Sequence, residues 1–162
     1  MLASTGEVKV RPPMSTPKIS ADQVQAFVYR YWRVLAEKLA GEMEKLYTYD
    51  ATVFNPFSQR MEPGRVSAAR KEREYFAPST VFRAEITGPI EVSMPSDGIA
   101  VASYTFRWHA AGMAEHIVGK EFSKAVRNGR ATQVLVMDFE GKLRIVHEHL
   151  SDIWRDSAQL AD

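Results

Sequence analysis

The stretch RATQVLVMDFEGKLRIVHEHLS at residues 130–151 decides the fold class. It holds two runs rich in β-branched and apolar residues, which extend over 129–139 and 142–153 and are separated by a tight turn at Glu140-Gly141. Two such runs around a glycine turn are typical of an antiparallel β-hairpin. Working back toward the amino terminus, further runs predict strands at 51–57, 81–88, 89–94 and 99–110, with Pro56 interrupting the first of them.

Helical patterns precede most of these strands. Ser20 and Gln23 have the spacing of a capping box, which predicts the start of a helix. This helix carries an apolar stripe and reaches a plausible terminator at Gly41; the stripe is made of Val24, Phe27, Val28, Tyr31, Leu35 and Leu39. Shorter helices are predicted at 42–49 and, after a turn at Pro63-Gly64, at 65–77. Helices followed by antiparallel strands predict an α+β fold, with three N-terminal helices packed on a sheet.

Composition narrows the class of protein. The chain has 162 residues, 21 Lys plus Arg against 20 Asp plus Glu, and no cysteine. The length fits one domain. The absence of cysteine excludes disulfide scaffolds, thiolate metal sites and a cysteine nucleophile. A net charge of +1 argues against nucleic acid or an anionic membrane as the main partner. No apolar run approaches the length of a membrane helix, so we expect a cytoplasmic protein.

The two ends and one connection differ from the rest of the chain. Residues 1–19 mix small, basic and proline residues without periodicity, which predicts a disordered tail and leaves Met14 open as an alternative start. The folded domain is expected over 20–156, and 157–162 form a C-terminal tail. The charged segment 112–129 is expected to be a long connection, acting as a flap at the mouth of a pocket.

The sequence LYTYDATVFNPFSQ at 46–59, the hairpin at 130–151 and the helix order resemble the nuclear-transport-factor-2-like (SnoaL-like) superfamily. The resemblance covers about residues 20–155. It implies a cystatin-like fold, in which a strongly curved, mostly antiparallel sheet and the helices form a cone with an internal pocket. The superfamily includes ketosteroid isomerases, polyketide cyclases, dehydratases and a kinase association domain, so the resemblance implies a fold rather than one activity. It implies neither a cofactor nor a metal.

Matching the ketosteroid isomerases residue by residue retains one of their three catalytic positions. Tyr31 falls at the place of their oxyanion-binding tyrosine. Asn55 replaces the aspartate that acts as their general base. Because an amide accepts no proton near pH 7, the steroid mechanism is disfavoured. Their second aspartate falls at Gln133 or Val134, of which Gln133 still donates a hydrogen bond.

If the resemblance fixes the register, side-chain alternation predicts which residues face the pocket. On 99–110 these are Ala102, Tyr104, Phe106 and Trp108, and on the last strand Val146, Glu148 and Leu150. Glu148 is then the one carboxylate on a predicted pocket face, which makes it the first candidate for a general base or acid. The alternative is a salt bridge to Arg130 or Arg144. We expect Glu148→Gln to abolish turnover while leaving folding nearly intact.

Tyr31, the histidines and the charged segment at 65–74 each have a structural interpretation as well as a functional one. Tyr31 also fits a core position in its helical stripe. A metal site could use the imidazoles of His147 and His149, with His116 or His109 as a third ligand. Histidines on an outward strand face fit a dimer interface better. The basic residues at 65, 70, 71 and 73 are interleaved with Glu72 and Glu74, which indicates a solvated helix face.

Two function classes follow. The first is a cofactor-independent isomerase, cyclase or dehydratase that moves a proton on a small apolar or carbonyl-containing molecule. Its catalytic residues would be Glu148, Tyr31 and Asn55, and its substrate-binding residues Tyr104, Phe106, Trp108, Gln133, Val146 and Leu150. The second is a non-catalytic ligand-binding module, or one that forms a homodimer through the sheet. An open pocket would favour the first class, and a pocket filled by side chains the second.

Overall fold

The computed structural model describes residues 18–55, 60–77, 80–111 and 124–152. Its elements in chain order are α1 (Ala21–Ala36), the 3-10 helix η1 (Glu44–Leu46), β1 (Tyr47–Phe54), β2 (Glu62–Pro63), α2 (Gly64–Tyr75), β3 (Val81–Ile86), β4 (Glu91–Ser96), β5 (Ile99–Ala111), β6 (Lys124–Met137) and β7 (Leu143–Asp152). The described residues therefore form an α+β fold, as the sequence predicts.

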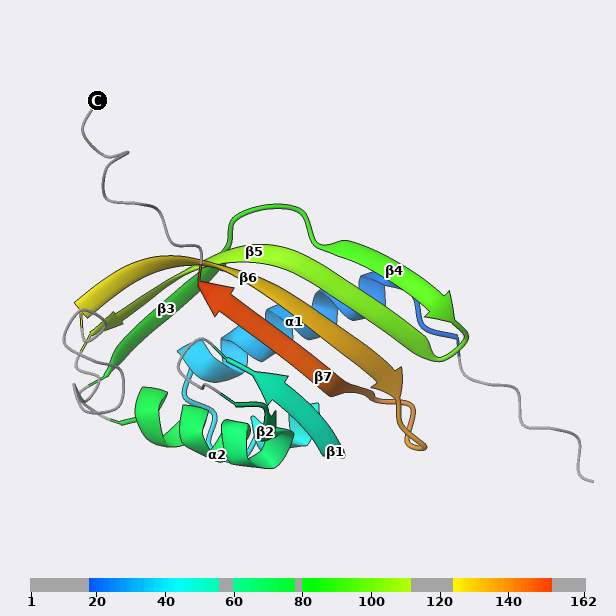
Figure 1. Cartoon of the computed structure of the whole chain (residues 1–162), viewed down its shortest axis with the longest axis horizontal. Helices are drawn as coiled ribbons and strands as arrows, with labels where there is room; N and C mark the ends of the chain where they lie inside the picture. Colours follow the sequence, from blue (N-terminus) through cyan, green and yellow to red (C-terminus); the bar gives the residue numbers. More distant parts are fainter. Residues whose placement is uncertain (1–17, 56–59, 78–79, 112–123, 153–162) are drawn as a thin grey trace, which may run out of the picture.

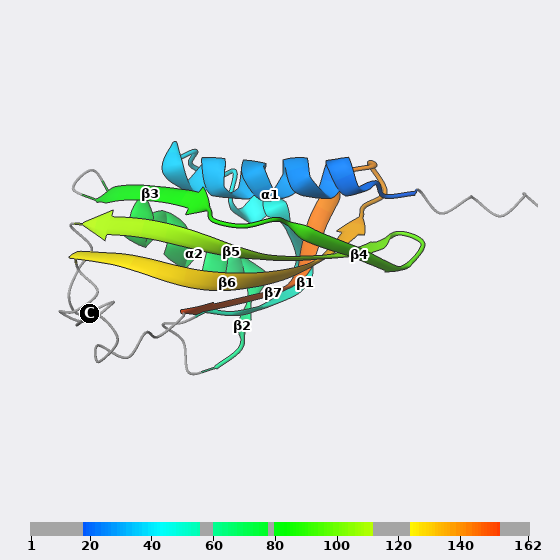
Figure 2. The same cartoon turned by 90° about the horizontal axis from the view of Figure 1, so that it is seen from above.

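The strands form one curved, mostly antiparallel sheet. Its order is β2-β1-β7-β6-β5-β3, and β4 also pairs with β5. Only the β1–β7 pair is parallel among the described strands. The long strands β5 and β6 arch over α1 and α2, which lie on the concave side (Figure 1). Seen from above, α1 runs along the side of the sheet that carries β3 and β4 (Figure 2).

Helix α1 begins as predicted and ends earlier than predicted. The Ser20 hydroxyl accepts a hydrogen bond from the Gln23 amide at 3.2 Å, and the Gln23 side chain accepts one from Ser20 N at 2.8 Å. The helix stops at Ala36 instead of reaching Gly41, because Lys38 adopts a positive φ of 54°. The Lys38 ammonium donates to the carbonyls of Ala77 and Thr80, which fixes the end of α1 beside the end of α2.

The predicted helix at 42–49 is wrong, so two α-helices replace the three expected. Only η1 is helical there, and β1 already begins at Tyr47. The residues of this segment favour a strand, and Tyr47, Ala51 and Val53 are buried along it, although Tyr49 is exposed. The predicted connection at 112–129 is also too long, since β6 begins at Lys124. The rest of that segment, residues 1–17 of the tail predicted at 1–19, and the tail predicted at 157–162 lie outside the described residues. Of the predicted N-terminal tail, Ile19 is described and is buried in the core.

Helix α2 packs unusually close to β1. A Cβ built on Gly64 would lie 2.7 Å from the Ala51 Cβ, so only glycine permits this approach. The buried face of α2 continues through Ser67 and Ala68, both small and fully buried. This close packing brings the next residues on the same face, one and two turns later, toward the interior of the cone.

The inner face of the sheet follows the predicted alternation on β5, where Ala102, Tyr104, Phe106 and Trp108 are buried. On β7 the alternation breaks. His147 pairs with Val134 while Ile145 pairs with Leu135, so Val146 is an extra residue in a bulge. Ile145 is therefore buried in the place predicted for Val146, which is half-buried.

Candidate functional site

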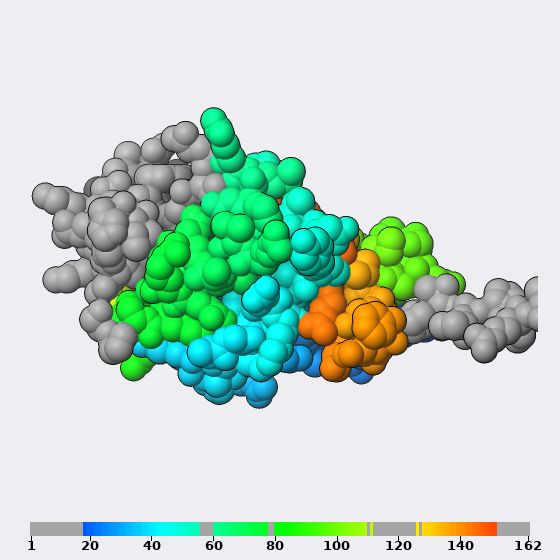
Figure 3. Space-filling model, turned by 90° about the horizontal axis from the view of Figure 1, so that it is seen from below, coloured from blue at the N-terminus to red at the C-terminus, as the bar shows by residue number. Residues whose placement is uncertain are grey.

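A small pocket lies between the two helices and the concave face of the sheet. Its volume is about 30 Å³, room for about two water molecules. Aromatic and aliphatic side chains form most of its wall: Trp32, Leu35, Tyr75, Phe82, Phe106, Trp108 and Leu150. A polar wall faces them, made of Tyr31, Asn55, Arg70, Lys71 and Glu74. From below, side chains of α2 (green) and of the cyan segment around η1 and β1 cover this side of the cone (Figure 3).

The aromatic wall is one continuous stack of rings. The ring centroids of Trp32 and Phe106 lie 4.6 Å apart, and those of Tyr75 and Phe82 4.7 Å apart. Phe82 also contacts Trp32 and Trp108 in stacked arrangements. The Trp32 indole N–H donates to the Tyr104 hydroxyl at 3.1 Å, which satisfies both polar groups behind the wall. The ring faces are suited to contact the flat apolar body of a small molecule, but the pocket of about 30 Å³ admits such a body only when the walls move apart.

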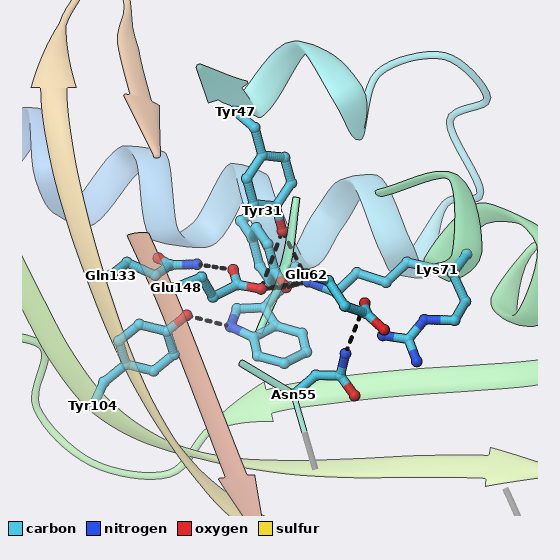
Figure 4. A network of polar contacts seen from close by, with 10 residues as sticks. Tyr31, Tyr47, Asn55, Glu62, Lys71, Tyr104, Gln133 and Glu148 are labelled. Carbon is cyan, nitrogen blue, oxygen red and sulfur yellow. Dashed lines mark hydrogen bonds and ion pairs between the residues drawn. The ribbon is translucent and has the colours of Figure 1, made fainter. Parts of the chain in front are cut away.

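Behind the polar wall lies a buried ion pair between Lys71 and Glu148 (Figure 4). The Lys71 ammonium also donates to the hydroxyls of Tyr31 and Tyr47, at 2.7 and 2.8 Å. Both tyrosines donate in turn to Glu148 Oε1, at 3.2 and 3.1 Å. The other oxygen, Glu148 Oε2, accepts from Gln133 Nε2 at 2.9 Å. We call these five residues the Lys71–Glu148 cluster.

Burial shapes the protonation of this cluster. It lowers the pKa of Lys71, and the Glu148 carboxylate opposes that change. It raises the pKa values of Tyr31 and Tyr47 well above their ordinary range, and the charge of Glu148 raises them further. Both tyrosines are therefore protonated at neutral pH and act as hydrogen-bond donors.

Glu148 Oε1 accepts more hydrogen bonds than a carboxylate oxygen has lone-pair directions for. Glu148 Oε1 receives Lys71, Tyr31 and Tyr47, whereas a carboxylate oxygen offers about two lone-pair directions. The two tyrosine bonds are long compared with the usual 2.7–2.8 Å of an O–H···O bond. Of these two tyrosines, Tyr31 borders the pocket and Tyr47 does not.

A second polar chain continues along the same wall. Asn55 Nδ2 donates to Glu62 Oε2 at 3.4 Å, and Arg70 Nη2 donates to the same oxygen at 2.7 Å. Glu74 lies one turn after Arg70 and is only 7 % exposed. Burial raises the pKa of Glu74, while Arg70 opposes the rise.

The structure places the predicted site residues in two groups. Tyr31, Asn55, Phe106, Trp108 and Leu150 all border the pocket. Four other predicted site residues are absent from the described lining of the pocket: Tyr104, Gln133, Val146 and Glu148. Glu148 is fully buried and paired with Lys71 rather than with Arg130 or Arg144, so it reaches the pocket only through Tyr31 and Lys71.

The expectation of a solvated face at 65–74 is wrong for two of its six charges. Arg65 and Arg73 are exposed, whereas Lys71 and Glu74 are buried. The sequence did contain a sign of this burial. One face of the helix carries residues that recur every three or four positions and that are buried in the structure: Gly64, Ser67, Ala68, Lys71 and Glu74. Tyr47 was not predicted as a site residue, because the segment 42–49 was assigned to a helix and β1 begins at Tyr47.

The histidines do not form a metal site in the part of the chain that the structure describes, where no group of three potential ligands lies together. The His147 ring contacts the Thr52 hydroxyl at 2.8 Å, while His149 and His109 are exposed. His116 lies outside the described residues. No described helix is long and apolar enough to span a membrane.

Glu74→Gln is expected to stabilise the protein at neutral pH. The raised pKa means that the folded protein binds this proton more tightly than the unfolded chain. The contribution of Glu74 to stability is therefore fully present below the ordinary carboxyl pKa and lost as the pH rises through the raised pKa of the folded protein. Thermal unfolding should show a gain of about 2 °C for the variant at pH 7.5 and none near pH 4.

The matched control is Glu72→Gln, on the same helix, whose carboxylate accepts a hydrogen bond from Gly41 N at 2.9 Å. It should bring no gain at either pH. A lower melting temperature of Glu74→Gln at pH 7.5 would show that the attraction of Arg70 outweighs the burial of the carboxylate.

Comparison with known proteins identifies the fold. No protein-family model matches the sequence, and no curated protein matches it. Solved structures do. A Caulobacter vibrioides protein with a cystatin-like fold has a TM-score of 0.66 at 17% identity, covering 86% of this chain and 94% of that one. A nuclear transport factor 2-like superfamily protein from Salmonella enterica has a TM-score of 0.65 at 16% identity, covering 84% and 92%.

A ketosteroid isomerase-like protein from Erwinia carotovora has a TM-score of 0.62 at 15% identity, covering 83% of this chain and 96% of that one. These likenesses confirm the predicted nuclear-transport-factor-2-like, cystatin-like fold. At such low identity they concern the fold alone, so the function has to come from the residues of the site.

Proposed function

We propose that this domain binds a small, largely apolar molecule through an oxygen acceptor and donates a proton to that oxygen. The observation that carries the proposal is that Tyr31 and Lys71 border an aromatic pocket and are hydrogen-bonded to a fully buried carboxylate. Buried charge of this kind, next to a pocket, is typical of functional sites. A structural neighbour described as ketosteroid isomerase-like supports a function of this kind on the same scaffold.

The proton path follows the hydrogen bonds. Tyr31 turns its O–H from Glu148 Oε1 to the ligand oxygen, and as that oxygen gains charge it takes the proton. Tyr31 then takes a proton from Lys71, whose amine is left neutral beside Glu148 and Tyr47 and is recharged from solvent. The lowered pKa of Lys71 favours this transfer. Isomerisation, cyclisation and dehydration all need such a donor at an oxygen.

In this path Glu148 stabilises the charged form of Lys71 and does not contact the ligand. Asn55, held by Glu62, offers its amide at the other end of the polar wall. This assignment replaces direct proton transfer by Glu148 with transfer by Tyr31 and Lys71, because these are the two described residues of the Lys71–Glu148 cluster that border the pocket.

A second candidate is a module that pairs with another copy through the sheet. The observation that favours it is the pocket volume of about 30 Å³, which admits one polar end group but not a ring unless the aromatic walls move apart. The convex face of β5, β6 and β7 also carries no described helix (Figures 1 and 2).

The two candidates differ in what the pocket retains. The full chain is incubated with a cell extract of small molecules, washed and denatured, and the released compounds are identified by mass spectrometry. We expect compounds with an apolar body and an oxygen acceptor. Leu150→Trp, which fills the pocket, should retain none of them, and Val126→Trp, at a site 62% exposed, should retain them all. No retained compound, together with a dimeric mass by light scattering, would favour the second candidate.

A further inference from the structure

Two atoms of the polar wall are buried without hydrogen bonds. Arg70 Nε and Glu74 Oε1 have no hydrogen-bond partner among the residues that the structure describes. They lie 4.0 Å apart, which is too far for a direct hydrogen bond between them. Both residues border the pocket. The Glu74 side chain is 4% exposed, so bulk water does not replace the missing partner freely.

Leaving such groups unpaired is costly, and native proteins rarely do so without a reason. Here one atom is a donor and the other an acceptor, so a single group that both accepts and donates would satisfy both. A hydroxyl oxygen about 2.9 Å from each atom closes a triangle on the 4.0 Å base. We propose that Arg70 Nε and Glu74 Oε1 form a subsite for a hydroxyl group of the bound molecule.

The surrounding charges exclude the ionic alternatives. A ligand ammonium would pair with Glu74 but would face the cations of Arg70 and Lys71. A ligand carboxylate would pair with Arg70 but would face Glu74. A neutral hydroxyl suits both, and the ion pair between Arg70 and Glu62, 2.7 Å long, holds the guanidinium in place for it.

This inference rests on the proposed function and names its ligand class. The ligand would be a compact ring compound with at least one hydroxyl group. Its hydroxyl would occupy the Arg70–Glu74 subsite, and its ring would enter as the aromatic walls move apart. Its second oxygen would meet Tyr31 further along the same wall. The cost of burying the Glu74 carboxylate also explains why Glu74→Gln is expected to gain stability.

Phenol and toluene test the subsite directly, because they differ by a hydroxyl in place of a methyl group. A purely apolar pocket prefers toluene, since phenol gives up hydrogen bonds to water on entry. A subsite with two ionised partners reverses that order, and we expect phenol to bind about tenfold more tightly. Calorimetry on the full chain at pH 7.5 gives both affinities.

Glu74→Met should lose the preference for phenol and bind toluene at least as well as before. The matched control, Arg73→Met, replaces an exposed charge of the same helix and should keep the preference. Toluene binding more tightly than phenol in the unmodified protein would overturn the subsite and leave the proposed function standing. A phenol preference that persists in Glu74→Met would overturn the assignment to Glu74. Failure of both probes to bind would contradict the proposed function, and the subsite with it.

Discussion

Glu148→Gln should lower the free energy of unfolding by about 3–5 kcal/mol. The substitution leaves the Lys71 ammonium buried without its carboxylate, and a buried charge that has lost its partner is strongly destabilising. This expectation differs from the one drawn from the sequence, in which the fold was nearly unaffected, because the sequence did not indicate that Lys71 is the partner. Urea denaturation at pH 7.5 measures the change.

The double variant Lys71→Met, Glu148→Gln provides the control. It removes both charges, so it should lose much less stability than the two single variants added together. We expect a coupling energy of at least about 2 kcal/mol from the double-mutant cycle. A coupling near zero, with Glu148→Gln as stable as the unmodified protein, would show that the two groups do not form a buried ion pair.

Tyr31→Phe and Tyr47→Phe should separate ligand binding from stability. Each hydroxyl accepts from Lys71 and donates to Glu148 Oε1, so each substitution should lower stability by a similar amount, about 1–3 kcal/mol. Only Tyr31 borders the pocket. Tyr31→Phe should therefore weaken the binding of cyclohexanone about tenfold, whereas Tyr47→Phe should change it little.

Affinities come from titrations followed by NMR, and stabilities from urea denaturation of the same two variants. Methylcyclohexane, which has a similar shape and no oxygen, should bind both variants equally. Equal loss of cyclohexanone affinity in the two variants would mean that Tyr31 acts only through the stability of the cluster.

Much of the fold could be predicted from the sequence. The capping box at Ser20 and the alternation on β5 depend on local spacing, and both are present in the structure. The bulge at Val146 and the early end of α1 could not be predicted. The first depends on pairing between two strands, and the second on contacts of Lys38 with residues far along the chain.

The site was harder to predict than the fold. Tyr31 and Glu148 were selected by a resemblance and by alternation, and their side chains do meet. Lys71 was assigned to solvent because charges on a polar helix are usually exposed. What brings it inside is the close approach of α2 to β1 at Gly64, which becomes visible only once the two elements are in contact. A run of small residues on one face of a charged helix is the sequence signal for such an approach.

The most direct measurement of the central claim uses the protein labelled with 13C at the ζ carbon of its tyrosines. We expect cyclohexanone to shift the Tyr31 resonance in a saturable way and the Tyr47 resonance less, and methylcyclohexane to shift neither. The Tyr31→Phe spectrum assigns the signal. A Tyr31 resonance that stays unchanged at saturating cyclohexanone would contradict the account, because the proposed proton donor would then not meet the ligand oxygen.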